Sequence, residues 1–212
     1  MLGRTNENGR DVSSGGSALG PNLVSLARPL LGWLLATVLA ADGESYAALP
    51  IVVLACISDY VDGRMARRRG VESFPGRLVD NLCDAFFLGL ALWSMGAARV
   101  WAPEGGWLHE SAALHQLPLA AFAAAFSSYL ARMLLERRRG GAAARSRIGH
   151  GAGIANYGLV VAGAVEAWPA IALPAVLVEV ALLAVSFLNL AAVIENVRLM
   201  FPAGSASPTM PA

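Results

Sequence analysis

The sequence has few charged residues and no lysine. Only 15% of its 212 residues are charged, whereas about a quarter are charged in an ordinary soluble domain. All 16 basic residues are arginine, 56% of the chain is apolar, and the mean hydropathy is +0.55. This composition argues against a soluble domain and indicates a membrane protein. The net charge of +1 argues against nucleic acid as a partner.

Cysteine is scarce, and no internal repeat stands out. Cys56 and Cys83 both lie in apolar surroundings, and two cysteines are too few for a disulfide framework. We expect both to be buried free thiols. The absence of a repeat counts against a secondary transporter built from two inverted halves.

The apolar residues form long runs that predict an all-α integral membrane protein with six transmembrane helices. Each run has about twenty residues, which is the length that crosses the hydrocarbon core of a bilayer. The six expected spans are Leu23 to Ala41, Tyr46 to Val61, Leu78 to Ala98, Ala112 to Leu135, Gly151 to Trp168 and Ala170 to Ile194.

The ends of the chain differ from this apolar centre. Residues 1–20 are rich in Gly, Ser and Asn without a hydrophobic period, so we expect a disordered arm and not a signal peptide. Residues 21–200 are expected to form the six-helix membrane domain. Residues 201–212 are expected to be a flexible tail.

The arginines indicate the orientation in the membrane. They precede or begin the first span, lie between the second and third, end or follow the fourth, and follow the sixth; only Arg99 falls in a loop of the other side. The positive-inside rule then places both termini in the cytoplasm, and we expect a bacterial inner (cytoplasmic) membrane protein. Trp101, Trp107 and Trp168 are expected at the opposite membrane interface.

Four aspartates stand out at the boundary of the second and third spans. Asp59 and Asp62 are three residues apart, and Asp80 and Asp84 are four apart, so each pair shares a face of a helix. A carboxylate at membrane depth is unfavourable unless a cation satisfies it. Clustered carboxylate oxygens suit Mg²⁺ or Mn²⁺, which also bind phosphate.

The residues around these aspartates fit a phosphate ligand. Gly63 and Ala66 have little or no side chain and leave space for a ligand near the backbone. Arg67 supplies a planar guanidinium that can bind phosphate through two hydrogen bonds.

The whole stretch resembles the signature of the CDP-alcohol phosphotransferase family, D-x-x-D-G-x-x-A-R, eight residues, then G-x-x-x-D-x-x-x-D. All eight fixed positions are present: Asp59, Asp62, Gly63, Ala66, Arg67, Gly76, Asp80 and Asp84. The resemblance implies a bundle of six transmembrane helices that transfers the phosphatidyl group of CDP-diacylglycerol to an alcohol and releases CMP. It also implies a homodimer.

The same resemblance implies a role for each matching residue. Two divalent ions would be held by Asp59, Asp62, Asp80 and Asp84, and Asp84 would also be the general base. CDP would be bound by Asn22, Asp62, Gly63, Ala66, Arg67 and Gly76. Asn22 follows Pro21, and the pair has a second interpretation as the start of a helix.

The acceptor alcohol is less constrained by the sequence. Arg132, Arg145 and Arg147 are candidates for holding the phosphate of an acceptor, and glycerol 3-phosphate is the first expectation. Inositol phosphate, serine and a lipid remain alternatives, because Gly149-His150 stands where relatives that make phosphatidylglycerophosphate carry Gly-Lys.

Several other interpretations remain open. Arg28, inside the first apolar run, is expected to extend to the membrane interface or to bind lipid phosphate. Glu179 is expected to be a structural hydrogen-bonding residue or part of a dimer contact. A divalent-cation transporter is the alternative function, although the outer halves of the spans carry few polar residues. The six apolar spans disfavour a soluble prenyl diphosphate enzyme.

Overall fold

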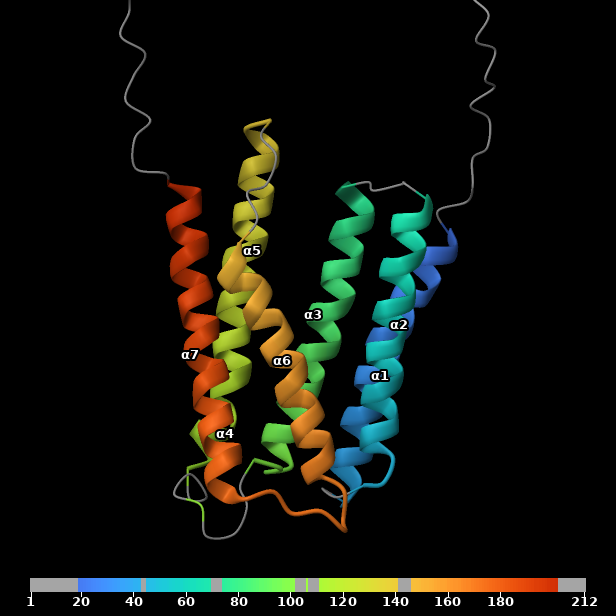
Figure 1. The fold of residues 1–212 in the computed structure, drawn as a ribbon, viewed down its shortest axis with the longest axis vertical. Helices are drawn as coiled ribbons and strands as arrows, with labels where there is room; N and C mark the ends of the chain where they lie inside the picture. The colour runs from blue at the N-terminus through green and yellow to red at the C-terminus, as the bar shows by residue number, and fades with distance from the viewer. Residues whose placement is uncertain are drawn as a thin grey trace, which may run out of the picture.

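The described part of the chain is entirely helical. The computed structural model describes residues 19–42, 45–69, 74–101, 106, 111–140 and 146–201, without the side chains of 19–24, 42, 62–69 and 112. Within these ranges there are seven α-helices and no strand (Figure 1). The helices are α1 (Leu19–Asp42), α2 (Ala48–Arg69), α3 (Phe74–Ala97), α4 (Ala112–His115), α5 (Leu117–Arg138), α6 (Arg147–Glu166) and α7 (Ala175–Met200).

Four of these helices, α3, α5, α6 and α7, are long and apolar enough to cross a membrane. These four helices are consistent with the predicted all-α membrane protein. In α1 and α2 the described apolar segments, Ser25–Ala41 and Ala48–Val61, are shorter. The count of six spans therefore stays a prediction.

The predicted fourth span is divided into two helices. It begins at Ala112 as expected, but α4 ends at His115 and α5 starts at Leu117, with Gln116 between them. Pro118 lies in the first turn of α5. Because proline has no N–H to donate to a preceding turn, it starts a new helix here instead of continuing the old one.

The helices pack as two groups that α6 connects. α1 lies against α2 and α3, α5 lies against α7, and α6 contacts α7 as well as α2 and α3 (Figure 1). Glycine permits close approach in the first group, since a Cβ on Gly32 would lie 3.2 Å from the Cα of Phe87. The shared core includes Leu35 of α1, Phe87 of α3 and Leu182 of α7.

Two aromatic residues show how the bundle is packed where α3 and α6 end. Trp101 is 1% exposed and packs in the core just after the end of α3, and its depth at the membrane interface stays a prediction. Its ring fills the space beside Gly163 of α6, where there is no side chain to exclude it. Trp168 packs edge-to-face against Tyr46, 5.2 Å between ring centroids. Trp107 lies outside the described residues.

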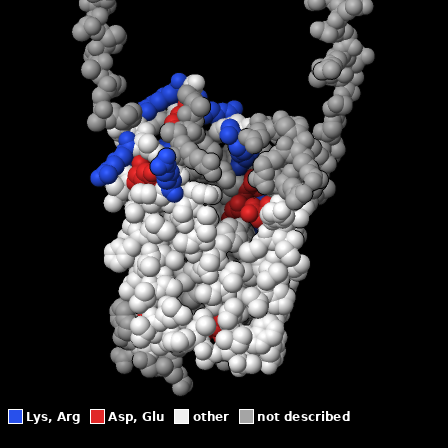
Figure 2. All heavy atoms as spheres, viewed as in Figure 1, with Lys and Arg blue, Asp and Glu red and all other residues white. Residues whose placement is uncertain are grey.

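Charged side chains gather near one end of the bundle. Figure 2 shows arginines around that end and acidic residues close below them, while the remaining visible surface is almost uncharged. Long helices that follow one another along the chain run in opposite directions, so α2 ends and α3 begins at this end, together with the end of α5 and the start of α6 (Figure 1). The bundle therefore brings the aspartate-bearing turns of α2 and α3 close to the arginines at the end of α5.

The buried residues of the bundle also bear on two sequence expectations. Cys56 and Cys83 are both free, and Cys83 is buried while Cys56 is half-buried. Glu179 is 1% exposed, which fits a structural residue inside the chain better than a dimer contact.

Candidate active site

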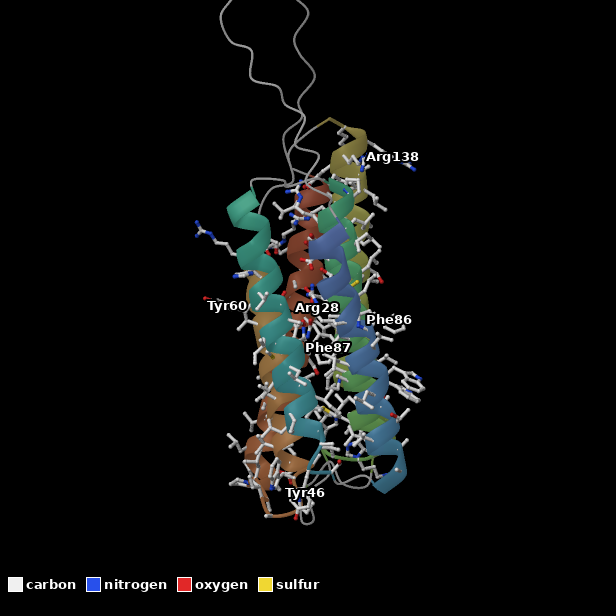
Figure 3. The ribbon with its side chains drawn as sticks, turned by 90° about the vertical axis from the view of Figure 1, so that its right-hand side faces the viewer. Arg28, Tyr46, Tyr60, Phe86, Phe87 and Arg138 are labelled. Carbon is white, nitrogen blue, oxygen red and sulfur yellow. The ribbon has the colours of Figure 1, made fainter. Side chains whose placement is uncertain are left out.

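Three aspartates converge on one arginine inside the bundle. Arg28 of α1 is fully buried, and its guanidinium pairs with Asp59 of α2 and with Asp80 and Asp84 of α3. Its Nη1 lies 3.1 Å from Oδ1 of Asp59. Figure 3 shows Arg28 within the bundle, between the end that carries Arg138 and the end that carries Tyr46.

This arrangement corrects the expectation for Arg28. We predicted that its side chain extends to the membrane interface or to lipid phosphate, but it points inward and has no exposed surface. The physical reason is electrostatic, because an inward guanidinium meets three carboxylates in a setting of low dielectric constant. A cation inside an apolar run is thus satisfied by anions of neighbouring helices.

The carboxylates receive further hydrogen bonds from two helices. The hydroxyl of Ser25, on α1, donates to Oδ1 of Asp80 at 3.2 Å. The hydroxyl of Tyr157, on α6, donates to Oδ1 of Asp84 at 3.0 Å, and the Tyr157 ring stacks on Phe87. Asp84 is the most enclosed of the three aspartates, with 26% of its side chain exposed. Its orientation is therefore set by partners on both α1 and α6.

The donor set fits a hard divalent cation by its chemistry. Carboxylate oxygens are the ligands that Mg²⁺ and Mn²⁺ prefer, and Asp59, Asp80 and Asp84 all direct an oxygen to one place. Among the described residues, no three His, Cys, Asp or Glu side chains are placed so that they could hold a metal ion together. The guanidinium of Arg28 lies among these oxygens instead.

A cavity of about 660 Å³ opens beside the aspartates. Asp59, Asp84 and Tyr157 form one part of its wall, and further residues of α3, α5, α6 and α7 contribute the rest. Asn156 and Asn189 line it too, and their amides exchange two hydrogen bonds of 3.0 Å that join α6 to α7. The cavity is large enough for a small polar molecule next to Asp84.

Basic side chains line another part of the cavity. They are Arg77, Arg132 and His150. Arg132 is 2% exposed, its guanidinium lies 5.9 Å from the ring centre of Tyr129, and Nη1 is 4.0 Å from Glu136. The three groups favour an anionic ligand at this part of the wall.

Of the three arginines predicted to bind the acceptor, Arg132 lines the cavity. Arg147 is exposed at the start of α6 and is not among the lining residues. Arg145 lies outside the described residues. His150, which we did not assign to the acceptor, also lines the cavity.

The predicted CDP-binding residues lie at the charged ends of α1, α2 and α3. Asn22 is in the first turn of α1, and Gly76 is in the first turn of α3. Asp62, Gly63, Ala66 and Arg67 belong to the last turns of α2, and their side chains, like that of Asn22, are outside the described part. Their roles therefore stay predictions.

The start of α6 is fixed against α7 at the edge of the cavity. Ser146 caps the helix by accepting from the backbone N–H of Gly149 at 2.8 Å. The carboxylate of Glu195, on α7, accepts from the Ser146 hydroxyl and from the N–H of Ile148 at 3.1 Å. A carboxylate at a helix N-terminus is stabilised by the unpaired N–H groups there, so this contact holds the cavity wall in place.

The family of the chain follows from its match to a family model. The model for CDP-alcohol phosphatidyltransferase matches residues 18–201. The chain belongs to the CDP-alcohol phosphatidyltransferase family. This confirms the resemblance drawn from Asp59 to Asp84, and it makes the protein a helical membrane transferase whose family uses CDP-alcohol substrates.

The chain is similar in part to a curated relative, a cardiolipin synthase (CMP-forming) from Streptomyces coelicolor. It is 37% identical over 73 residues, which cover 32% of this chain and 34% of the relative. The aligned stretch is thus only part of either protein.

The sequence alone did not identify Arg28 and Tyr157 as members of this candidate site. A signal existed for Arg28, since a lone cation in an apolar run requires an anion and the four aspartates lie at the boundary of the next two apolar runs. No comparable signal existed for Tyr157. It lies 73 residues after Asp84, and only the packing of α6 beside α3 brings its hydroxyl to that carboxylate.

Proposed function

We propose that this protein transfers the phosphatidyl group of CDP-diacylglycerol to the hydroxyl of an alcohol and releases CMP, and that the reaction depends on Mg²⁺ or Mn²⁺. The observation that carries the proposal is the convergence of Asp59, Asp80 and Asp84 beside a cavity. The family supports the class of donor.

The chemistry follows from what the side chains can do. The acceptor oxygen attacks the phosphorus of the phosphatidyl group, the bond from that phosphorus to the bridging oxygen breaks, and CMP leaves. Asp84, beside the cavity, accepts the proton of the attacking hydroxyl. When bound, two divalent ions would hold both phosphates of the donor and offset the charge that builds on the leaving oxygen.

The remaining polar residues position the two substrates. Tyr157 holds Oδ1 of Asp84. Arg77 and Arg132 on the cavity wall would bind the phosphate of an acceptor, with Arg145 and Arg147 as further candidates. A wall with two arginines and His150 favours a phosphorylated acceptor, and glycerol 3-phosphate is our first candidate.

A phospholipid acceptor is the second candidate. It is favoured by the similarity to a protein named cardiolipin synthase (CMP-forming). The donor remains CDP-diacylglycerol, and the attacking hydroxyl would belong to a headgroup such as that of phosphatidylglycerol. Inositol phosphate and serine complete the acceptors to be compared.

A product assay tests the proposal. Purified protein in vesicles is given CDP-diacylglycerol, Mg²⁺ or Mn²⁺, and each acceptor in turn, and CMP release and the lipid headgroup formed are measured. We expect metal-dependent CMP release with one class of acceptor. No release with any acceptor, together with movement of Mn²⁺ into sealed vesicles, would instead favour a divalent-cation transporter.

We further propose that the charged end of the bundle faces the cytoplasm of a bacterial cell and that the protein works in the inner membrane. The arginines between the second and third expected spans, and those between the fourth and fifth, support this orientation. A homodimer is implied by the family resemblance and stays a prediction.

A further inference from the structure

Arg28 takes the position at which the carboxylates of the site are closest together. It pairs with one aspartate of α2 and two of α3, and it is the only partner that these three share among the described contacts. Its guanidinium reaches Asp80 through Nη2 and Asp84 through Nη1. Figure 3 shows its side chain directed into the bundle from α1.

The charges explain why a cation is needed at this position. Three carboxylates held close together repel one another, and the repulsion is strong where the dielectric constant is low. Arg28 is fully buried, whereas the side chains of Asp59 and Asp80 are 48% and 44% exposed. One guanidinium balances only one of three negative charges, so the cluster still attracts further positive charge.

The oxygens that bind Arg28 are also those that a divalent ion requires. Oδ1 of Asp80 and Oδ1 of Asp84 each bond to the guanidinium, and Oδ1 of Asp84 also accepts from Tyr157. Oδ1 of Asp84 already accepts from two donors, Arg28 and Tyr157, so a metal ion that coordinated this oxygen would have to displace one of them. A divalent ion beside a guanidinium is also repelled by it.

We propose that Arg28 is an internal cation that competes with divalent ions for Asp80 and Asp84. In the metal-free protein it holds the three carboxylates together and stabilises the junction of α1, α2 and α3. Binding of divalent ions requires its guanidinium to move off these oxygens, so Arg28 lowers the affinity for metal. This inference rests on the metal site of the proposed function.

The decisive measurement is binding of Mn²⁺ alone, without substrates. Free Mn²⁺ is followed by electron paramagnetic resonance as it is titrated into purified wild-type protein, Arg28→Gln and Arg28→Lys. We expect Arg28→Gln to bind Mn²⁺ about tenfold more tightly or better, because it lacks the competing charge. Arg28→Lys keeps the positive charge but lacks the planar guanidinium with its paired donors. Its affinity for Mn²⁺ should lie between that of the wild type and that of Arg28→Gln.

Arg77→Gln is the matched control. Arg77 lines the same cavity and carries the same charge, but it makes none of the ion pairs with Asp59, Asp80 or Asp84 given above. We expect less than about a twofold change in Mn²⁺ affinity for this variant, because an exposed charge is screened by solvent. A rise as large as that of Arg28→Gln would mean that any positive charge in the cavity acts alike, and the proposal would be wrong.

Thermal unfolding supplies a second readout. In chelator, Arg28→Gln should melt below the wild type, since three carboxylates lose their shared cation, and Mn²⁺ should raise its melting temperature more than that of the wild type. An arginine with a purely structural role would lower the melting temperature equally with and without Mn²⁺.

The outcomes separate this inference from the proposed function. If the wild type binds no Mn²⁺, the metal site itself is wrong. If the wild type binds Mn²⁺ but Arg28→Gln binds it no more tightly, only the competition is wrong. If Arg28→Gln does not fold, the affinity of Arg28→Lys decides, and a value equal to or weaker than wild type overturns the proposal.

Discussion

At the scale of single residues, Asp84 has a position that distinguishes it from the other aspartates. It lines the cavity, its side chain is the most enclosed of the three, and it is held from α6 as well as from α1. A general base must lie within reach of the hydroxyl that it deprotonates. Asp84 meets this requirement for an acceptor whose hydroxyl lies in the part of the cavity beside it.

Replacing Asp84 by Asn tests this role. Asn keeps the shape but cannot accept the proton, so CMP release should fall by about a hundredfold or more, while binding of CDP-diacylglycerol should change little. The control is Glu166→Gln, which alters a carboxylate at the opposite end of α6, where it accepts from the N–H of Leu173. Near-normal turnover by Asp84→Asn would remove Asp84 as the base.

Tyr157→Phe tests whether the hydroxyl on α6 positions Asp84. The hydrogen bond to a charged group is worth about 1.5–3 kcal/mol, and the ring stacking on Phe87 is kept. We expect kcat to fall about tenfold or more with KM for the donor nearly unchanged. Tyr46→Phe, at the opposite end of the bundle (Figure 3), is the control with wild-type kinetics. Equal kinetics for the two variants would contradict a positioning role for Tyr157.

At the scale of helices, Gly163 sets the distance between α6 and the core. A Cβ at this position would lie 2.6 Å from Sδ of Met95 and 2.6 Å from the ring of Trp101. Both neighbours are buried and have little room to move. The absence of a side chain at Gly163 is therefore a packing requirement of this helix.

Gly163→Ala should accordingly destabilise the protein. Overpacking of a filled core costs about 1–3 kcal/mol, and we expect a lower melting temperature in detergent. Gly158→Ala is the control on the same helix, because a Cβ there meets nothing within 4 Å. That variant should be neutral or gain up to about 1 kcal/mol, since Ala favours helix over Gly. Equal loss in both variants would mean that helix packing at Gly163 is not the cause.

Which elements the sequence could predict depends on how local their signals are. The helices and the spacing of Asp59, Asp80 and Asp84 were readable, because a helix places residues three or four apart on one face. The break at Gln116 was missed because α4 has only four residues and the apolar run continues across it. The inward direction of Arg28 depends on the packing of three helices, which spacing along one helix does not contain.

At the scale of the whole molecule, the distribution of charge predicts which end faces the cytoplasm. Figure 2 shows arginines gathered around one end, and Figure 3 places Arg138 there and Tyr46 at the other, where Arg99 follows α3. Positively charged segments are retained on the cytoplasmic side during membrane insertion. The candidate site lies near this end, so donor and acceptor would enter from the cytoplasm.

Labelling of single cysteines measures this orientation. In a background that lacks Cys56 and Cys83, we introduce Arg138→Cys or Tyr46→Cys, both exposed positions, and treat intact cells with a thiol reagent that does not cross the inner membrane. Tyr46→Cys should react in intact cells and Arg138→Cys only after the membrane is opened. The replacement of one arginine leaves the rest of the group in place, so the orientation itself should be unchanged. The reverse pattern would place the carboxylates and the cavity on the outer side, away from cytoplasmic substrates.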